Sequence, residues 1–538
     1  MVNLIFNTNY KKIIMKFTRL LLLFSINVLF FGSLLLFGCK TNRQETKSKP
    51  NILFIAVDDM NDWIAPLGGL KICKTPNMDK FAAQAMLFEN AHCASPACGP
   101  SRLSVMTGVQ PSKSGVLNNL WYDGPEWRNI PVLKNIETIE QFFHNRGYET
   151  LGGGKIYHTL SPPWTMATQV EPESWDFYFP SPYVNIPYQV RAKNEVAYPH
   201  NFKGWRHSSF TWGPIDVKDE KMADYQVVDW ARYQLNQKHE KPFFLACGLF
   251  RPHIPWEVPQ KYFDMYPLED IPDLVIKEDD LKDGFELSRR YLHKFILENK
   301  QWKKAIQGYL ASITFADAQI GRLLEALENS EFIKNTIVVL WSDHGMHLGE
   351  KENWEKFTLY EESTRVPFML KVPGVTKAGS RSSQPVSLLD IYPTLAELAG
   401  YEVPGHCDGT SVLPLAVDPK AKRDHSALTS FKMFKSPGNI IGHSLRGERF
   451  RYTYYQNHNL EELYDHRTDP NEFDNLAYNN QYDAIIDLFR KELMERVDGL
   501  SMEKIMELPK GYIIKDGKVE NLKYTRMKDL PLRKTKKR

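Results

Sequence analysis

The chain has 538 residues, of which 42% are hydrophobic and 25% charged, and its formal net charge is +3. This composition is typical of globular proteins and excludes the disordered and fibrous classes. Residues 1–38 contain four basic and no acidic residues, so the remainder carries a formal charge of −1. The charge therefore gives no support to nucleic-acid binding. Because single hydrophobic cores stop growing near roughly 250–300 residues, the length predicts two subdomains.

Residues 1–38 indicate an export signal. Lysines and an arginine precede an uncharged apolar run over residues 20–37, which ends at Gly38-Cys39. This order is typical of a processed signal, and the segment before Cys39 resembles a bacterial lipobox. The alternative is an uncleaved transmembrane anchor, since about 18 apolar residues just span a bilayer. We expect a bacterial, exported protein anchored to the membrane through a lipid on Cys39, facing the periplasm or the cell surface, with residues 39–49 as a tether.

Three short apolar runs, over residues 52–57, 242–249 and 336–341, have the length of buried strands. Their continuous apolar character predicts central strands of a parallel sheet that is covered on both faces. Residues 76–88 are predicted to form an amphipathic helix with Pro76 in its first turn. Strands that alternate with helices indicate an α/β fold.

Acidic residues directly follow two of these strands. Asp58 and Asp59 come after the first strand, and Asp343 and His344 come after the third. Open α/β sheets bind ligands outside the carboxyl ends of their strands, so we expect these four residues on one rim. Adjacent carboxylates repel unless a cation neutralises them. Such an oxygen-rich set suits calcium, although one imidazole is unusual for that ion. The alternative for Asp58 and Asp59 is helix capping or turn formation.

The C-terminal part has a different pattern. A helix is predicted over residues 390–400, short strands begin near residue 427, and a further helix is predicted over residues 482–497. This pattern predicts a small α+β subdomain with an antiparallel sheet. We place the first domain at residues 50–418, the C-terminal subdomain at 419–520 and a basic, solvated tail at 521–538. Residues 162–210 lack periodicity and are predicted to form long loops over the site.

Cys98 lies in the run Cys98-Gly99-Pro100-Ser101-Arg102, which is followed by Thr107-Gly108. A free cysteine is often a small apolar filler of the core. A tyrosine-phosphatase loop needs a longer spacing between its cysteine and its arginine. The run instead resembles the signature of type I sulfatases, in which this cysteine is oxidised to formylglycine, the catalytic aldehyde.

Three further motifs resemble the same family. They are Gly154-Lys155-Ile156-Tyr157-His158, Pro252-His253-Ile254-Pro255 and Trp354-Glu355-Lys356. Each is ambiguous alone: Lys and His three residues apart also occur on surface helices, and a histidine between prolines is often an ordinary loop residue. Together, in the family's order between Asn51 and about Leu476, they resemble the iduronate-2-sulfatase-like group.

The resemblance implies an alkaline-phosphatase-like sandwich, with a large central mixed, mostly parallel sheet flanked by helices, and a sulfuric ester hydrolase. It implies one calcium ion held by Asp58, Asp59, residue 98, Asp343 and His344. It also implies that the substrate is a sulfated polysaccharide or oligosaccharide and that a formylglycine-generating, sulfatase-maturating enzyme modifies Cys98. The catalytic residues would be Cys98, Arg102, Lys155, His158, His253 and Lys356.

The resemblance also implies a role for each catalytic residue. Lys155 and Lys356 would neutralise the sulfate oxygens, and Arg102 would hold the hydrated aldehyde. Asp343 would be the base for the attacking hydroxyl. His253, with Lys356, would protonate the departing sugar oxygen, and His158 would take a proton from the second hydroxyl.

Two alternative functions remain at this stage. One is a phosphatase or phosphodiesterase of the alkaline phosphatase superfamily, and the other is a non-catalytic lipoprotein that binds sulfated glycans. The substrate is also open between 2-O-sulfated iduronic acid in heparan or dermatan fragments and an algal polysaccharide such as ulvan. Candidate sugar platforms, with core packing as their alternative, are Trp164, Trp205, Trp212 and Trp256. Disulfides are an option for Cys73, Cys93, Cys247 and Cys407 in an exported protein.

Overall fold

The computed structural model describes Met15 and residues 49–119, 125–158, 171–179, 210–273, 275–287, 290–433, 440–507 and 509–529. The chain divides into two units, residues 1–48 and 49–538, and the fold below is that of the second. The predicted export signal, apart from Met15, and Cys39 lie outside the described residues. Among the described helices, none combines the length and apolar character that crossing a membrane requires.

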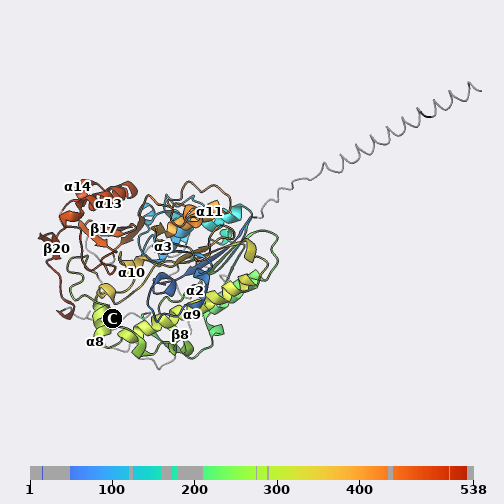
Figure 1. The fold of residues 1–538 in the computed structure, drawn as a ribbon, viewed down its shortest axis with the longest axis horizontal. Helices are drawn as coiled ribbons and strands as arrows, with labels where there is room; N and C mark the ends of the chain where they lie inside the picture. Colours follow the sequence, from blue (N-terminus) through green and yellow to red (C-terminus); the bar gives the residue numbers. More distant parts are fainter. Residues whose placement is uncertain are drawn as a thin grey trace, which may run out of the picture. The chain divides into compact units, whose positions relative to one another are not determined.

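An eight-stranded mixed sheet forms the centre of the fold (Figure 1). Its strands, in spatial order, are β13 (Arg381–Ser382), β2 (Met86–Phe88), β12 (Phe368–Lys371), β9 (Thr336–Ser342), β1 (Asn51–Val57), β7 (Phe243–Gly248), β4 (Glu149–Gly154) and β5 (Phe177–Phe179). Only β12 runs antiparallel to its neighbours in this sheet. The predicted mixed, mostly parallel sheet is confirmed, and the three apolar runs are β1, β7 and β9.

Helices cover both faces of this sheet. Alternate residues of β1 explain why, since Leu53, Ile55 and Val57 enter one core while Ile52 and Phe54 enter the other. The first core packs against α2 (Pro76–Ala82), α6 (Ala223–Leu235) and α9 (Trp302–Glu328). The second packs against α3 (Cys98–Thr107), α5 (Ile139–Asn145) and α11 (Ile391–Leu398). Figure 1 shows α3 and α11 on the opposite side of the sheet from α2 and α9, which makes a three-layer sandwich.

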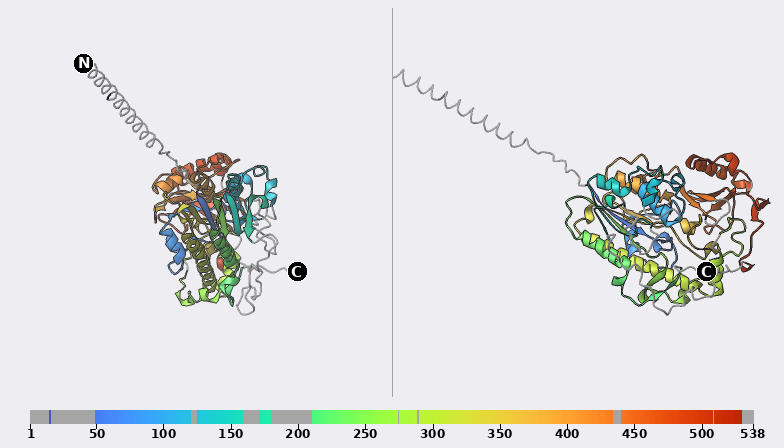
Figure 2. Two further views of the ribbon diagram at one scale, coloured as in Figure 1. Left: turned by 90° about the vertical axis from the view of Figure 1, so that its right-hand side faces the viewer. Right: turned by 180° about the vertical axis from the view of Figure 1, so that it is seen from behind.

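A second, smaller sheet forms the predicted C-terminal subdomain. Its antiparallel strands are β15 (Ala427–Lys432), β16 (Ile441–Arg446), β17 (Phe450–Gln456) and β18 (Leu460–Asp465). One face packs on α13 (Asp483–Arg496), and the other meets residues 281–287 and 357–360 of the main domain. The red elements of this subdomain lie to one side of the central sheet in the right-hand view of Figure 2. The predicted antiparallel α+β unit is therefore confirmed.

Shorter elements connect these layers. The strands are β3 (Ala91–His92), β6 (Trp212–Ile215), β8 (Trp256–Pro259), β10 (His347–Leu348), β11 (Trp354–Glu355), β14 (Val386–Ser387), β19 (Tyr512–Lys515) and β20 (Lys518–Asn521). The helices are α4 (Pro111–Ser114), α7 (Gln260–Phe263), α8 (Arg290–Glu298), α10 (Glu361–Thr364), α12 (Leu413–Val417) and α14 (Met502–Ile505).

Two predictions about these parts need correction, and the open question of disulfides is answered for the described cysteines. The helix predicted over residues 76–88 ends at Ala82, and Met86–Phe88 form β2, because these buried residues pair with β12 and β13. The predicted loop over residues 162–210 contains β5 in its described part. No disulfide joins the described cysteines: Cys73, Cys93, Cys247 and Cys407 are free.

Candidate active site

Neighbouring strands deliver the acidic residues to one rim of the main sheet. Val57 and Ser342 are paired in parallel register, so Asp58 and Asp343 follow at the same edge. The Asp343 N–H donates to the Val57 carbonyl at 3.1 Å, and the Asp59 N–H donates to Asp343 Oδ1 at 3.0 Å. Four residues at this edge are completely buried: Asp58, Asp59, Asp343 and His344. The predicted common rim therefore exists.

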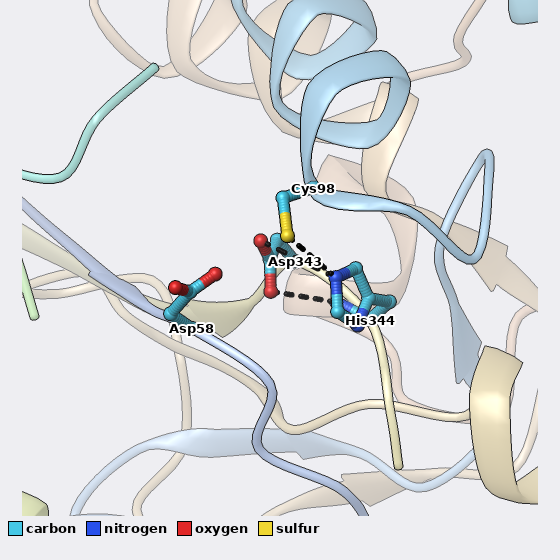
Figure 3. Close-up of side chains that lie close together, drawn as sticks. All are labelled: Asp58, Cys98, Asp343 and His344. Carbon is cyan, nitrogen blue, oxygen red and sulfur yellow. Dashed lines mark hydrogen bonds and ion pairs between the residues drawn. The ribbon is translucent and has the colours of Figure 1, made fainter. Parts of the chain in front are cut away.

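Cys98 is the first residue of α3, and its side chain points toward this rim (Figure 3). Its Sγ lies 3.2 Å from His344 Nε2 and 3.0 Å from Lys356 Nζ, and His158 interacts with it as well. Burial raises the pKa of the thiol, but Lys356, Lys155 and His344 outweigh it and hold the pKa well below its usual value. A cysteine that only fills the core is not surrounded by cationic groups in this way.

Arg102, one helical turn after Cys98, donates hydrogen bonds to Asp58 and Asp343. Its Nε donates to Asp343 Oδ2 at 2.7 Å and its Nη2 to Asp58 Oδ1 at 3.2 Å. The remaining hydrogen bonds go to the carbonyls of Val57, Lys155 and Ile156. These five bonds equal the five N–H donors of a guanidinium. Arg102 thus contacts both carboxylates in this structure, and its contact with the hydrated aldehyde of residue 98 stays a prediction.

The two predicted lysines reach the rim from strands of two different sheets. Lys155 follows β4 and pairs through Nζ with Asp58 Oδ2. Lys356 follows β11, and its Nζ lies 2.5 Å from Asp59 Oδ1. Both lysines are almost completely buried. Two ammonium groups therefore flank residue 98, each paired with one of the adjacent carboxylates.

The two predicted histidines occupy different environments. His158 is buried, and burial lowers its pKa, which favours a neutral imidazole that accepts a proton. The His253 side chain is 19% exposed and lies with Nε2 at 3.9 Å from Asp59 Oδ2. Its Nδ1 lies 2.6 Å from the Ile254 carbonyl, so Nδ1 carries a proton and Nε2 faces the site. Of the two histidines, His253 is thus the more exposed to solvent.

A metal ion fits the donor set at this rim. One possible ligand group consists of Asp58, Cys98, Asp343 and His344, whose ligand atoms lie within 4.8 Å of one another. His344 Nδ1 donates to the Gly345 carbonyl at 3.0 Å, which directs Nε2 toward the group as in typical metal sites. One buried carboxylate oxygen, Asp59 Oδ2, has no hydrogen-bond partner among the described residues.

The electrostatics of the rim also favour a cation. Burial raises the pKa of Asp343 to about 7, despite the opposing charge of Arg102. Burial lowers the pKa of His344, but Asp343 outweighs it and raises that pKa to about 9. Without a metal ion, Asp343 and His344 therefore hold protons that partly offset the negative charge of the rim. A bound cation would take over this role and displace those protons.

Tyr309 is a site residue that the sequence analysis missed. It comes from α9, and its hydroxyl donates to the Asp59 carbonyl at 2.7 Å and accepts from the Asn61 N–H at 2.9 Å. These bonds fix the backbone at Asp59, which has a positive φ of 61°. No local pattern indicates this contact, because 250 residues separate Tyr309 from Asp59.

Two of the predicted sugar platforms are core residues. Trp212 is 2% exposed and Trp256 is fully buried, and both pack edge-on against Phe210. They face each other where β6 pairs with β8, in the core that includes α9. Neither side chain can therefore stack on a sugar. Trp164 and Trp205 lie outside the described residues.

Comparisons with known proteins agree with this architecture. A profile of the sulfatase family matches residues 50–401, and one described as N-sulphoglucosamine sulphohydrolase, C-terminal, matches residues 349–498. A sulfatase from Formosa agariphila is 34% identical over 84% of this chain and 89% of its own length. Human iduronate 2-sulfatase is 27% identical over 79% of this chain and 88% of its own.

A solved structure supports the fold. The structure of a protein in complex with its substrate D-glucosamine-2-N,6-O-disulfate superposes with a TM-score of 0.64 at 21% identity, covering 84% of this chain and 99% of its own. The three-layer sandwich with acids at the strand ends defines the alkaline-phosphatase-like class. Within that class, the chain belongs to the sulfatase family and is a sulfuric ester hydrolase.

Proposed function

We propose that this protein removes a sulfate ester from a sulfated polysaccharide or oligosaccharide, with residue 98 as formylglycine and with calcium at the rim. The placement of Cys98 carries the proposal: its side chain is buried between Lys356, His158 and His344, beside three carboxylates. In the mature enzyme, the hydroxyls of the hydrated aldehyde would take the place of Sγ. The names of the iduronate 2-sulfatase relative and of the glucosamine-disulfate complex support a sugar substrate.

Calcium would be held by Asp58, Asp59, Asp343, His344 and residue 98, and when bound it would supply positive charge to the sulfate oxygens. Lys155 and Lys356 add two buried ammonium groups, which stabilise negative charge strongly because little water screens them. Arg102 keeps Asp58 and Asp343 in place through one hydrogen bond to each carboxylate. The site is thus arranged to cancel the charge that shields the sulfur atom of a sulfate ester.

The proton transfers follow from the environments of the acids and bases. Asp343 would be the base for the attacking hydroxyl, because its carboxylate lies within 4.8 Å of the reactive atom of residue 98. His253, at the exposed side, would act in its doubly protonated form, in which Nδ1 keeps its proton for the Ile254 carbonyl and Nε2 donates its own to the departing sugar oxygen. His158, whose pKa burial lowers, would accept a proton from the second hydroxyl of residue 98. That last transfer regenerates the aldehyde, whereas a serine has no second hydroxyl to release the sulfate.

Export and lipid anchoring through Cys39 are part of the same proposal, since sulfated polysaccharides are met outside the cell. The positive flank, the apolar run and the small residue before Cys39 support it. A Cys39→Ala variant should lose its lipid and leave the membrane fraction. Retention of that variant in the membrane fraction would instead favour an uncleaved anchor.

The test of function is sulfate release from a substrate panel. The panel contains heparin- and dermatan-derived disaccharides with a 2-O-sulfated uronic acid, ulvan oligosaccharides, 4-nitrophenyl sulfate and 4-nitrophenyl phosphate. We expect sulfate release from at least one sulfated sugar, no comparable phosphate release, and no turnover by Cys98→Ser. Faster hydrolysis of the phosphate ester, or full activity of Cys98→Ser, would contradict the proposal.

A further inference from the structure

The segment that carries Lys356 has an unusual backbone. We call residues 350–357 the lysine strap. Four of its non-glycine residues have positive φ angles: 54° at Lys351, 49° at Glu352, 69° at Glu355 and 76° at Phe357. Such conformations are unfavourable for non-glycine residues and persist only where surrounding contacts impose them. The strap must therefore be held by its neighbours.

Lys351 makes the first of these contacts. Its side chain is 2% exposed, and its Nζ donates to Asp280 Oδ1 at 2.7 Å and to the Glu472 carbonyl. The ammonium also lies 4.9 Å from the ring centre of Tyr360 and 5.4 Å from that of Tyr464. Because Glu472 and Tyr464 belong to the C-terminal subdomain, Lys351 ties the strap to that subdomain.

Helix α8 holds the strap from the other side. Arg290 Nε donates to Glu352 Oε2 at 2.6 Å, and each side chain of this ion pair is only 3% exposed. The buried Trp354 donates from Nε1 to His293 Nδ1 at 3.0 Å. Burial lowers the pKa of His293 to about 4, so the ring is neutral and Nδ1 can accept this bond. The strap is thus clamped between α8 and the C-terminal subdomain.

Lys356, near the end of the strap, lies beside residue 98. Lys356 Nζ lies 3.0 Å from Cys98 Sγ and 2.5 Å from Asp59 Oδ1. The next residue, Phe357, donates its N–H to the Pro96 carbonyl at 3.2 Å, two residues before Cys98. A shift of the strap would therefore move the ammonium relative to residue 98.

We propose that Lys351 is a positioning residue for the sulfatase reaction. Its buried ion pair with Asp280 holds the strap in its positive-φ conformation, so that the Lys356 ammonium reaches the side chain of residue 98. Removing the ammonium leaves the Asp280 carboxylate without its partner, and the strap relaxes toward ordinary φ values. This inference rests on the proposed role of Lys356 and assigns to the C-terminal subdomain a part in building the active site.

The test is a double-mutant cycle between Lys351→Met and Lys356→Ala, with kcat/KM measured on the most active substrate of the panel above. A misplacement of about 1 Å costs on the order of 100-fold in rate, so we expect Lys351→Met alone to lose about 10- to 100-fold. In the Lys356→Ala background the same change should cost less than about threefold, because the group it positions is gone. Equal losses in both backgrounds would show a merely structural role and overturn the inference.

A matched control is Lys277→Met. Lys277 also bridges to the C-terminal subdomain, through Asp474 at 2.8 Å and the Phe473 carbonyl at 2.7 Å, whereas neither of these hydrogen bonds involves a strap residue. Its kcat/KM should stay within about twofold of the wild type, well short of the loss at a misplaced catalytic group. If Lys351→Met folds poorly, Lys351→Met/Asp280→Asn removes both buried charges, which is often neutral for stability. That double variant should recover the melting temperature and not the activity, and recovery of both would overturn the inference.

Hydrogen–deuterium exchange separates this inference from the proposed function, because it needs no substrate. Peptides covering residues 346–358 should exchange faster in Lys351→Met than in the wild type and in Lys277→Met. Unchanged exchange there would overturn the inference even if the enzyme is active. Conversely, full activity of Lys356→Ala would remove the proposed role of Lys356, and the inference with it.

Discussion

Arg102 Nε lies 2.7 Å from Asp343 Oδ2, and both side chains are fully buried. Breaking a buried ion pair by removing one partner costs about 3–5 kcal/mol, because the other charge is left unpaired. We therefore expect Arg102→Ala to lower the free energy of unfolding by about that amount, measured by urea denaturation. The control is Arg232→Ala, which removes a surface pair with Asp229 and should cost less than about 1 kcal/mol. Equal losses in the two variants would contradict the conclusion that the buried contacts of Arg102 stabilise the fold.

Calcium should stabilise the folded protein. A ligand that binds only the native state at 100 times its Kd adds about 2.7 kcal/mol to the free energy of unfolding. We expect the melting temperature of metal-depleted protein to rise on adding calcium, and calorimetric titration to give one ion per chain. Asp59→Asn should weaken the binding by about tenfold or more, whereas Asp408→Asn, a change at a partly exposed ion pair, should not. A melting temperature that calcium does not change would argue against this site.

Glu140 should make stability fall with rising pH. Burial raises the pKa of this fully buried carboxyl from 4.5 to about 7, and Tyr157 donates to it at 2.6 Å. Between these two values only the unfolded chain releases the proton, so this group lowers the free energy of unfolding by about 1.4 kcal/mol per pH unit. Below pH 4.5 both states keep the proton, and above about 7 the loss is complete.

Glu140→Gln keeps an acceptor for Tyr157 and removes this titration. Relative to the wild type, the variant should gain about 3 kcal/mol in the free energy of unfolding between pH 4 and pH 8. Urea denaturation at several pH values measures the difference. A constant difference between the two proteins across this range would show that Glu140 ionises normally in the folded state.

His253→Gln should distinguish between leaving groups. A sugar alkoxide is a poor leaving group that needs a proton, whereas 4-nitrophenolate leaves without one. Loss of a general acid typically costs 10²- to 10⁴-fold, so we expect a loss of this size on a sulfated sugar and less than about tenfold on 4-nitrophenyl sulfate. His239→Gln is the control, because His239 pairs with Glu149 away from the rim. Equal losses of the His253 variant on both substrates would exclude His253 as the acid.

The rim of the sheet could be predicted from the sequence because its signals are local. Asp58 and Asp343 each follow an apolar run of strand length, and parallel strands present their carboxyl ends at one edge. The motifs around Cys98 and Lys155 lie in single short segments. Each of these predictions needed only the order of residues along a few consecutive positions.

The contacts that hold the site could not be predicted, because they join distant segments. Lys351 and Asp280 are 71 residues apart, and Tyr309 and Asp59 are 250 residues apart. Trp256 was a candidate sugar platform, but packing against Tyr309 and Phe210 places it in the core. Helical periodicity over residues 76–88 gave way to strand pairing at Met86 for the same reason. In each case tertiary packing, which leaves no local pattern, decided the outcome.

The mass of the peptide that contains residue 98 is the most direct test of the central claim. The protein should be purified from its own host, or from cells that also make a formylglycine-generating enzyme, and digested without reductants or alkylating agents. We predict the mass of formylglycine at residue 98, an aldehyde that a hydrazide reagent traps, in proportion to the sulfate-releasing activity of the preparation. An unmodified thiol at Cys98 in fully active protein would contradict the account.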